Sequence, residues 1–340
     1  MKYNLLGKTG VLVSELCLGA MTFGGKGYWE AIGQLKQEEV NQLVKMAIDS
    51  GINFIDTANA YSEGLSEILL GKSLKQLGIN RQQVVIATKV RLRMGPGANQ
   101  VGLSRLHILD SIDDSLQRLD MSYVDLLYIH GVDPITPLDE TMRALEDVVR
   151  SGKVRYIGIS NHPAWKVVKA NAIAEKHGWT KFIASQNYYT IAGRDIEREI
   201  VPMLQSEGIA LMPWSPLAGG FLSGKYTRNT EKAGDSRRDN FDFPPVNKTK
   251  AYDIIDVMLE IGKNHNVSVA QIALAWMLRK PAVTSIIIGA KKADQLKDNI
   301  DSTQLKLSDE EMQKLENISN LTPEYPGWMV ERQLQGRYPS

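Results

Sequence analysis

The stretch that decides the fold reads Phe54-Ile55-Asp56-Thr57-Ala58-Asn59-Ala60-Tyr61. The apolar run from Ile52 to Ile55 predicts a buried strand, and this run stops at an acid. A tyrosine follows five residues later, just before a helical pattern begins. Aspartate at the end of a strand is commonly just a turn or cap residue. The stretch is informative because the same arrangement, an apolar strand that ends in a polar residue, recurs down the chain.

Strand and helix patterns alternate along the rest of the sequence. A hairpin is predicted over residues 3–13, and two helical patterns over 37–50 and 66–77 are closed by Gly51 and Gly78. Apolar strands are expected at 16–19, 53–57, 84–89, 124–130, 154–160, 182–186, 209–215 and 283–288. Such strands are typical of a parallel sheet buried on both faces. About eight strand–helix units favour a closed (β/α)8 TIM barrel over an open doubly wound sheet.

We expect one α/β barrel domain over residues 1–340, with accessory helices and a tail, about 320–340, that serves as a substrate-side loop. Lys and Arg number 40 against 39 Asp and Glu, so no global field favours nucleic acid or an anionic membrane. Cys17 is the one cysteine, which excludes an internal disulfide and fits a reducing compartment. The sequence shows no leader and no apolar run long enough to span a bilayer, so we expect a cytoplasmic protein. The oligomeric state cannot be inferred from the sequence.

In a barrel of this kind the active site lies at the C-terminal ends of the strands. Those ends carry Asp56 with nearby Tyr61, Lys89, His130, Ser160-Asn161, Gln186 and Trp214-Ser215. Taken singly, the serines and Asn161 can be turn formers, and a lone histidine at an apolar strand end is more often structural. Lysine, however, is rarely buried unless it is paired. The convergence of the set on one rim therefore favours a catalytic site.

Four of these side chains suit proton transfer to a carbonyl. A free phenol titrates near pH ~10, and an ammonium close to Tyr61 is expected to lower its pKa. Asp56 would keep Lys89 charged and oriented, and a neutral His130 would hydrogen-bond a carbonyl oxygen. The result is an acid aimed at a carbonyl that becomes an alkoxide.

On these residues the chain resembles the aldo-keto reductases. The resemblance rests on Asp56-Thr57-Ala58 with Tyr61, Lys89, His130, Gly158-Ile159-Ser160-Asn161, Gln186, Trp214-Ser215-Pro216-Leu217 and Gly289-Ala290-Lys291 with Gln295 and Asn299. The stretch Ser215-Pro216-Leu217-Ala218-Gly219-Gly220 is nearest to the bacterial, plant and fungal branch with aryl-alcohol dehydrogenase-like members. The resemblance implies a (β/α)8 barrel that reduces aldehydes and ketones with NADPH, without a metal.

The resemblance also implies roles for residues. Tyr61 would be the general acid, tuned by Lys89 and Asp56, and His130 would orient the carbonyl. The cofactor would be held by Gly19, Met21, Asp56, Ser160, Asn161, Gln186, Trp214, Ser215, Pro216, Leu217, Gly219, Lys225, Arg237, Gly289, Lys291, Gln295 and Asn299. In that set Ser160, Asn161 and Gln186 would hold the nicotinamide carboxamide, and Trp214 would stack on the ring.

Two positions depart from the family pattern. Ile288 stands where relatives often have proline, and Gln295 stands where many have arginine, so NADH is not excluded as the cofactor. Positive charge for a 2′-phosphate could still come from Arg237, Arg238, Lys291 and Lys292.

Other functions remain open at this point. Gly219 to Lys225 matches a P-loop pattern, but Tyr226 follows where Ser or Thr should stand, and no helix is predicted there. The five histidines show no close pair, which makes a metal site unlikely. The same fold could serve as a cofactor-binding regulatory subunit like the potassium-channel β subunits. A Schiff-base aldolase would need Lys89 with a depressed pKa.

The expected substrate is a small carbonyl compound or alcohol. The connection from Gly131 to Pro137 is short, so that side of the pocket should be open. Tyr28, Trp29 and Trp328 could form a wall against a bulky or aromatic carbonyl, with Tyr61 and His130 at the reacting group. Equally, these aromatic residues could simply pack their own loops.

Overall fold

The computed structural model describes residues 1–230, 237–335 and 337, with backbone alone for Arg237, Asn240 and Gln335. The strands are β1 (Tyr3–Leu5), β2 (Leu12–Ser14), β3 (Leu16–Gly19), β4 (Phe54–Asp56), β5 (Val85–Val90), β6 (Val124–Ile129), β7 (Val154–Ser160), β8 (Phe182–Tyr188), β9 (Ala210–Trp214) and β10 (Ile286–Ile288). The helices are α1 (Gln37–Asp49), α2 (Leu65–Gln76), α3 (Arg105–Leu119), α4 (Leu138–Arg150), α5 (Ala164–His177), α6 (Ile200–Glu207), α7 (Arg237–Asn240), α8 (Lys248–His265), α9 (Val269–Leu278), α10 (Ala293–Asp301), α11 (Asp309–Ser319) and α12 (Gly327–Gln335).

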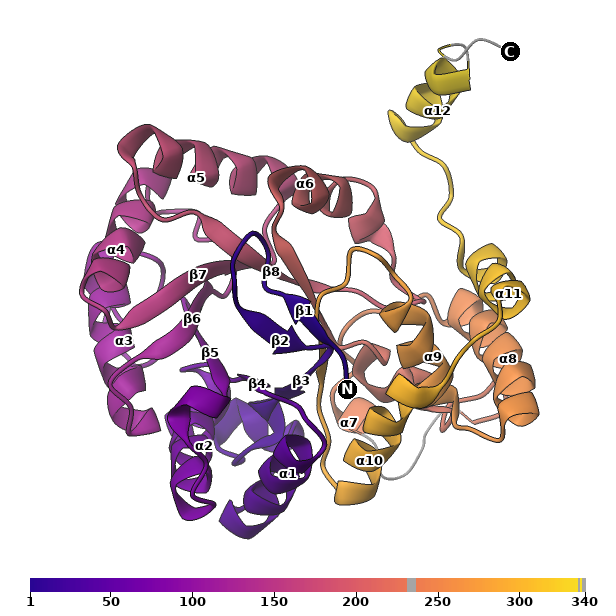
Figure 1. Cartoon of the computed structure of the whole chain (residues 1–340), viewed down its shortest axis with the longest axis horizontal. Helices are drawn as coiled ribbons and strands as arrows, with labels where there is room; N and C mark the ends of the chain where they lie inside the picture. The colour runs from indigo at the N-terminus through magenta and orange to yellow at the C-terminus, as the bar shows by residue number, and fades with distance from the viewer. Residues whose placement is uncertain (231–236, 336, 338–340) are drawn as a thin grey trace.

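Eight strands form one parallel sheet in the order β10-β3-β4-β5-β6-β7-β8-β9. The sheet closes on itself where Leu211 of β9 bridges Val283, and Thr284 N donates to Leu211 O at 2.9 Å. Helices surround the ring of strands (Figure 1). The predicted (β/α)8 TIM barrel is therefore confirmed.

The antiparallel hairpin of β1 and β2 lies across one end of the barrel (Figure 1). Asn4 Nδ2 donates to Thr284 O at 2.7 Å, and Lys8 N donates to Gly208 O at 3.2 Å, both just before a strand begins. Leu6 and Val13 pack into the barrel interior. The hairpin therefore seals the N-terminal ends of the strands, and the C-terminal ends are left for a site.

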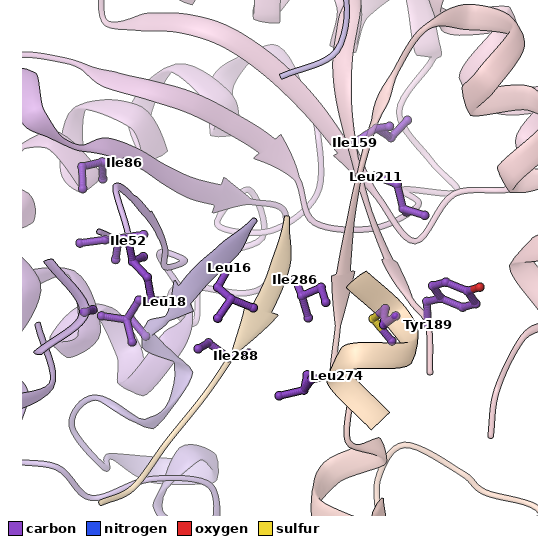
Figure 2. Packing of buried hydrophobic residues seen from close by; sticks show 14 of the residues in the cluster. Leu16, Leu18, Ile52, Ile86, Ile159, Tyr189, Leu211, Leu274, Ile286 and Ile288 are labelled. Atoms are coloured by element: carbon purple, nitrogen blue, oxygen red, sulfur yellow. The ribbon is translucent and has the colours of Figure 1, made fainter. Parts of the chain in front are cut away.

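A larger apolar layer fills the space between strands and helices. Figure 2 shows Leu16 of β3 beside Ile286 and Ile288 of β10, with Leu274 of α9 nearby. The interior of the barrel forms a second cluster that includes Cys17, the residue next to Leu16. Because the strands are buried on both faces, apolar residues stand at successive positions and not at alternate ones.

The C-terminal tail differs from its sequence prediction. Residues 327–335 form α12 where a loop was expected, and this helix lies beyond α11, apart from the barrel (Figure 1). The stretch 217–250, in which no period was found, also contains regular structure: a 3-10 helix over Ala218–Ser223, α7 and the start of α8. Among the residues that the structure describes, no helix is both long and apolar enough to cross a membrane.

Candidate active site

Lys89, near the end of β5, is the centre of a buried polar cluster. Its side chain is fully buried, and Nζ donates to Asp56 Oδ2 at 2.5 Å, to Thr57 O at 2.8 Å and to Tyr61 Oη at 3.2 Å. The other carboxylate oxygen, Asp56 Oδ1, accepts from Gln186 Nε2 at 2.8 Å. Each of the three ammonium hydrogens thus has an acceptor. We call Asp56, Tyr61, Lys89 and Gln186 the floor of the site.

The backbone that follows Tyr61 turns sharply and holds the phenol over Lys89. Ser62 and Glu63 have φ of 51° and 54°, and Gly64 has φ of 91°. Positive φ is uncommon for residues other than glycine. Ser62 Oγ anchors the turn by donating to Phe23 O at 3.0 Å. The tyrosine is therefore positioned by a fixed turn and not by a freely moving loop.

A second buried charged residue, Glu67, links β5 to the helices that cover it. Thr88, which precedes Lys89, donates through Oγ1 to Glu67 Oε1 at 2.5 Å, and Arg118 Nε donates to Glu67 Oε2 at 2.6 Å. Glu67 is fully buried on α2, and Arg118 lies on α3. This network joins the strand to the two helices that cover it.

Burial dominates the electrostatics of the floor. Burial raises the pKa of Asp56 above its ordinary value, and the charge and hydrogen bond of Lys89 oppose that rise. Burial alone would lower the pKa of Lys89, but Asp56 and Tyr61 outweigh it, and the net pKa is raised. Burial also raises the pKa of the Tyr61 phenol more than Lys89 lowers it. The sequence argument, which expected a lowered phenol pKa, is wrong on this point because it did not include the cost of desolvating a phenolate.

His130 follows β6 and lies beside the floor. Its backbone N donates to Val90 O at 2.9 Å, and its ring centroid is 5.8 Å from that of Tyr61. Burial, together with the charges of Lys89 and Arg91, holds the pKa of His130 well below its usual range, so the ring is neutral. Its Nδ1 is buried and has no hydrogen-bond partner within the described part of the chain.

The predicted nicotinamide-side residues meet at neighbouring strand ends of β7, β8 and β9. Asn161 Nδ2 donates to His130 O at 3.1 Å and to Ser160 Oγ at 2.9 Å, and Asn161 Oδ1 accepts from Trp214 Nε1 at 2.9 Å. Gln186 Nε2 donates to Asp56 Oδ1, so one end of its amide already has a partner in the floor. The backbone at the end of β7 joins this group to the floor, because Asn161 N donates to Gln186 O at 3.2 Å.

The other predicted cofactor residues lie at or after the ends of β3, β9 and β10 and on α10. Ser215 has φ of 54°, its Oγ accepts from Gly219 N at 2.9 Å, and Lys225 is exposed. Gly289 follows β10 in open space, and Lys291 N donates to Gln295 Oε1 at 3.0 Å. The remaining members are Gly19 at the end of β3, Met21 just after it, Pro216 and Leu217 after β9, and buried Asn299 on α10.

Arg237 and Arg238 were both expected near the 2′-phosphate, and the structure describes the side chain of Arg238 alone. The side chain of Arg237 lies outside what the structure describes. Arg238 is buried and bonds Ala218 O at 2.7 Å and Pro244 O at 2.8 Å, and it pairs with Asp242 at 2.6 Å. Its charge is therefore already used to hold the 218–244 segment together. Residues 226–230, which follow the P-loop-like stretch, form a turn closed by a Thr227–Thr230 bridge and no helix.

Aromatic side chains form an arc above the floor. Trp29 lies edge-on to Tyr61, with ring centroids 5.0 Å apart, and Tyr28 contacts Trp29 at 5.5 Å. The sequence prediction of a wall here missed Phe241, which contacts Tyr28 at 5.5 Å.

Phe243 extends this arc of aromatic rings to Trp214 at the end of β9. Its ring contacts Phe241 at 5.7 Å and stacks on Trp214 at 5.9 Å, with an angle of 13° between the planes. The sequence does carry a signal for this part of the wall. Two of the chain's six phenylalanines lie within three residues of each other in an otherwise polar loop. Trp328 is not brought to this wall: it lies on α12 and contacts Tyr325.

A hollow of about 300 Å³ adjoins the strand ends of β7 and β8. Asn161, His162, Asn187 and Tyr188 line it. His162 is buried with Nδ1 2.8 Å from Ser160 O, and burial lowers its pKa to about 4. The sequence analysis did not select this histidine, because nothing in its neighbours marks it as buried.

Comparisons with known proteins agree with this geometry. The family model of the Aldo/keto reductase family matches residues 15–320. The chain is 41% identical to a putative aryl-alcohol dehydrogenase of Schizosaccharomyces pombe, over 92% of this chain and 94% of the relative. It is 38% identical to the versiconal hemiacetal acetate reductase of Aspergillus parasiticus, over 93% and 96%. It is also 35% identical to a probable voltage-gated potassium channel subunit beta of Arabidopsis thaliana, over 96% and 99%. The chain belongs to the aldo/keto reductase family.

Proposed function

We propose that the protein reduces an aldehyde or ketone to the alcohol with a nicotinamide cofactor, reversibly, and that Tyr61 supplies the proton. The observation that carries this proposal is the bond from Lys89 Nζ to Tyr61 Oη within the buried floor. Membership of the family makes the chain an oxidoreductase that acts on carbonyl or alcohol groups. The residues below are proposed to perform that reaction.

Tyr61 starts the reaction protonated, because burial raises the pKa of its phenol. As negative charge develops on the substrate oxygen, the phenol proton moves to that oxygen, and the new phenolate faces the Lys89 ammonium. Asp56 keeps this ammonium charged and fixed in direction. The raised pKa of Lys89 also argues against a Schiff-base aldolase, which needs a neutral amine.

His130 is proposed to orient the carbonyl. The ring is neutral, so one of its nitrogens carries the single hydrogen. A buried N–H without an acceptor is rarer than an underused acceptor atom, and Nδ1 is buried without a partner. We therefore assign the proton to Nε2, where it can be donated to the substrate oxygen.

The side chains at the strand ends fit a nicotinamide dinucleotide. NADPH, when bound, supplies the hydride that the carbonyl carbon receives. Neutral amide and hydroxyl groups (Ser160, Asn161) stand beside the floor, and Trp214 offers an aromatic surface next to them. Exposed Lys291 lies near the start of α10 with Gln295, and its charge favours NADPH over NADH.

The wall of Trp29, Tyr28 and Phe241 favours a carbonyl compound that presents a ring to these side chains. Edge-to-face contact is one of the two arrangements that aromatic rings prefer, the other being offset stacking. The name of the yeast relative, an aryl-alcohol dehydrogenase, agrees with such a substrate.

The test is the Tyr61→Phe variant, assayed for aldehyde reduction and for NADPH binding by quenching of tryptophan fluorescence. We expect turnover to fall by a factor of about 10²–10⁴, because the general acid is lost. The affinity for NADPH should stay within about threefold, since the ring and its packing remain. Undiminished turnover would refute the assignment of Tyr61.

A regulatory subunit is the second candidate, because relatives carry the name of potassium channel β subunits. Wild-type protein that retains NADPH tightly but reduces no member of a broad carbonyl panel would favour it.

A further inference from the structure

Arg91 lies at the C-terminal end of β5, two residues beyond Lys89. Val90 is paired with Ile129 in the register of β5 and β6, and His130 N donates to Val90 O at 2.9 Å. Arg91 is therefore the next residue beside His130 on the adjacent strand end. In the mechanism proposed above its charge only helps to keep His130 neutral.

The guanidinium of Arg91 has no acidic partner in the described part of the chain. Its Nε and Nη2 both donate to Val132 O, at 3.2 and 3.0 Å, and it forms no ion pair with any residue that the structure describes. The acid of the neighbouring loop, Asp133, uses its carboxylate to accept from Leu103 N at 2.7 Å and Ile135 N at 2.9 Å. A half-buried cation without a counter-ion is costly, and such charges are usually paired.

The backbone of Arg91 is held in an uncommon conformation. Its φ is 141°, in the region that L-residues rarely occupy. The conformation is fixed because Gly102 N donates to Arg91 O at 2.9 Å, which closes the 91–102 loop on this residue. Backbone strain of this kind tends to occur at ligand sites.

We infer that Arg91 receives a carboxylate of the substrate, so that the preferred carbonyl compound carries a negative charge; this rests on the function proposed above. Anchoring Val132 requires a hydrogen-bond donor but not a charge. The two bonds to Val132 O occupy Nε and one hydrogen of Nη2, and Nη1 has no hydrogen bond to a described residue. The outer edge formed by Nη1 and Nη2 can donate two parallel bonds, which match a carboxylate.

Paired substrates test this assignment. Benzaldehyde and 4-carboxybenzaldehyde share the reacting aldehyde and differ in charge. The kcat/KM of each aldehyde is compared between wild type and variant, so the different intrinsic reactivities of the two aldehydes do not enter the comparison. For Arg91→Gln we expect kcat/KM to fall roughly 10- to 100-fold with 4-carboxybenzaldehyde and less than about threefold with benzaldehyde. Arg91→Lys, which keeps the charge but loses the fork, should restore part of the loss.

Arg93→Gln is the matched control, because it removes the same charge from the same loop. Arg93 is exposed and donates through Nη1 to Gly95 O and Gly97 O. This variant should change kcat/KM for the two aldehydes equally and only slightly.

The outcomes separate the possibilities. An equal loss with both aldehydes in Arg91→Gln would mean that Arg91 is only a tether for the loop after His130, and no loss would also overturn the inference. If the wild type reduces neither aldehyde, the broad carbonyl panel decides the proposed function separately. Benzoate binding to wild type and Arg91→Gln by calorimetry then decides the anion site: weaker binding in the variant supports it, and equal binding overturns it.

Discussion

The floor and the rim of the site meet at the end of β5, where Lys89 lies on the strand and Arg91 follows it, and the two cations have opposite surroundings. Lys89 is fully buried and bonds Asp56 and Tyr61, whereas Arg91 is half-buried and bonds a backbone carbonyl. The floor therefore contains its own counter-ion, and its electrostatics are set before any ligand arrives. At the rim, Arg91 has no acidic partner among the described residues, which is the arrangement suited to recognition.

The largest effect is expected when the floor loses its cation. Lys89→Met would leave the Asp56 carboxylate buried, with Gln186 as its remaining side-chain partner. Removing one member of a buried pair costs about 3–5 kcal/mol, so the free energy of unfolding in urea should fall by that amount. Turnover should fall as well, because the Tyr61 phenolate loses the adjacent charge.

Two further variants make this a comparison between floor and rim. The double variant Asp56→Asn, Lys89→Met removes both charges and should recover most of the lost stability. Arg91→Gln, at the rim, should change the free energy of unfolding by less than about 1 kcal/mol. Equal destabilisation by Lys89→Met and Arg91→Gln would show that the charges of the floor and the rim contribute equally to the free energy of unfolding.

His162 belongs to the rim but is buried like the floor. Its folded-state pKa of about 4 lies below the ordinary value of 6.5, so the unfolded chain binds the proton more readily. The stabilising contribution is therefore complete above pH ~6.5 and is lost as pH falls toward 4, by up to about 3 kcal/mol. His162→Gln should flatten the dependence of the urea midpoint on pH over this range.

His177→Gln is the control for that measurement, since His177 is exposed at the end of α5. It should leave the pH dependence as in the wild type. A His162→Gln protein whose stability still falls with the wild-type slope would mean that His162 is protonated in the folded state.

The sequence could predict the barrel because each strand and helix carries its own periodic signal. It also predicted that Asp56, Lys89 and His130 converge, since the C-terminal ends of parallel strands meet at one rim. It could not predict the direction of the Tyr61 pKa, which depends on how deeply the cluster is buried. Nor could it show that Arg238 pairs with Asp242 while Arg91 meets no acid among the described residues, because such pairings depend on the folded course of the loops.

The smallest effect is expected from the tail, which the sequence placed near the substrate and the structure places apart from the barrel (Figure 1). Two contacts that hold the tail come before α12: Arg198 pairs with Glu324 at 2.9 Å and donates to Thr322 O at 3.1 Å. A chain that ends at Pro326 keeps these contacts and loses Trp328. Its KM for benzaldehyde and its free energy of unfolding should match the full chain within about twofold and 0.5 kcal/mol. A KM raised more than about fivefold, with the stability unchanged, would return Trp328 to the substrate wall and require α12 to fold back over the rim when substrate binds.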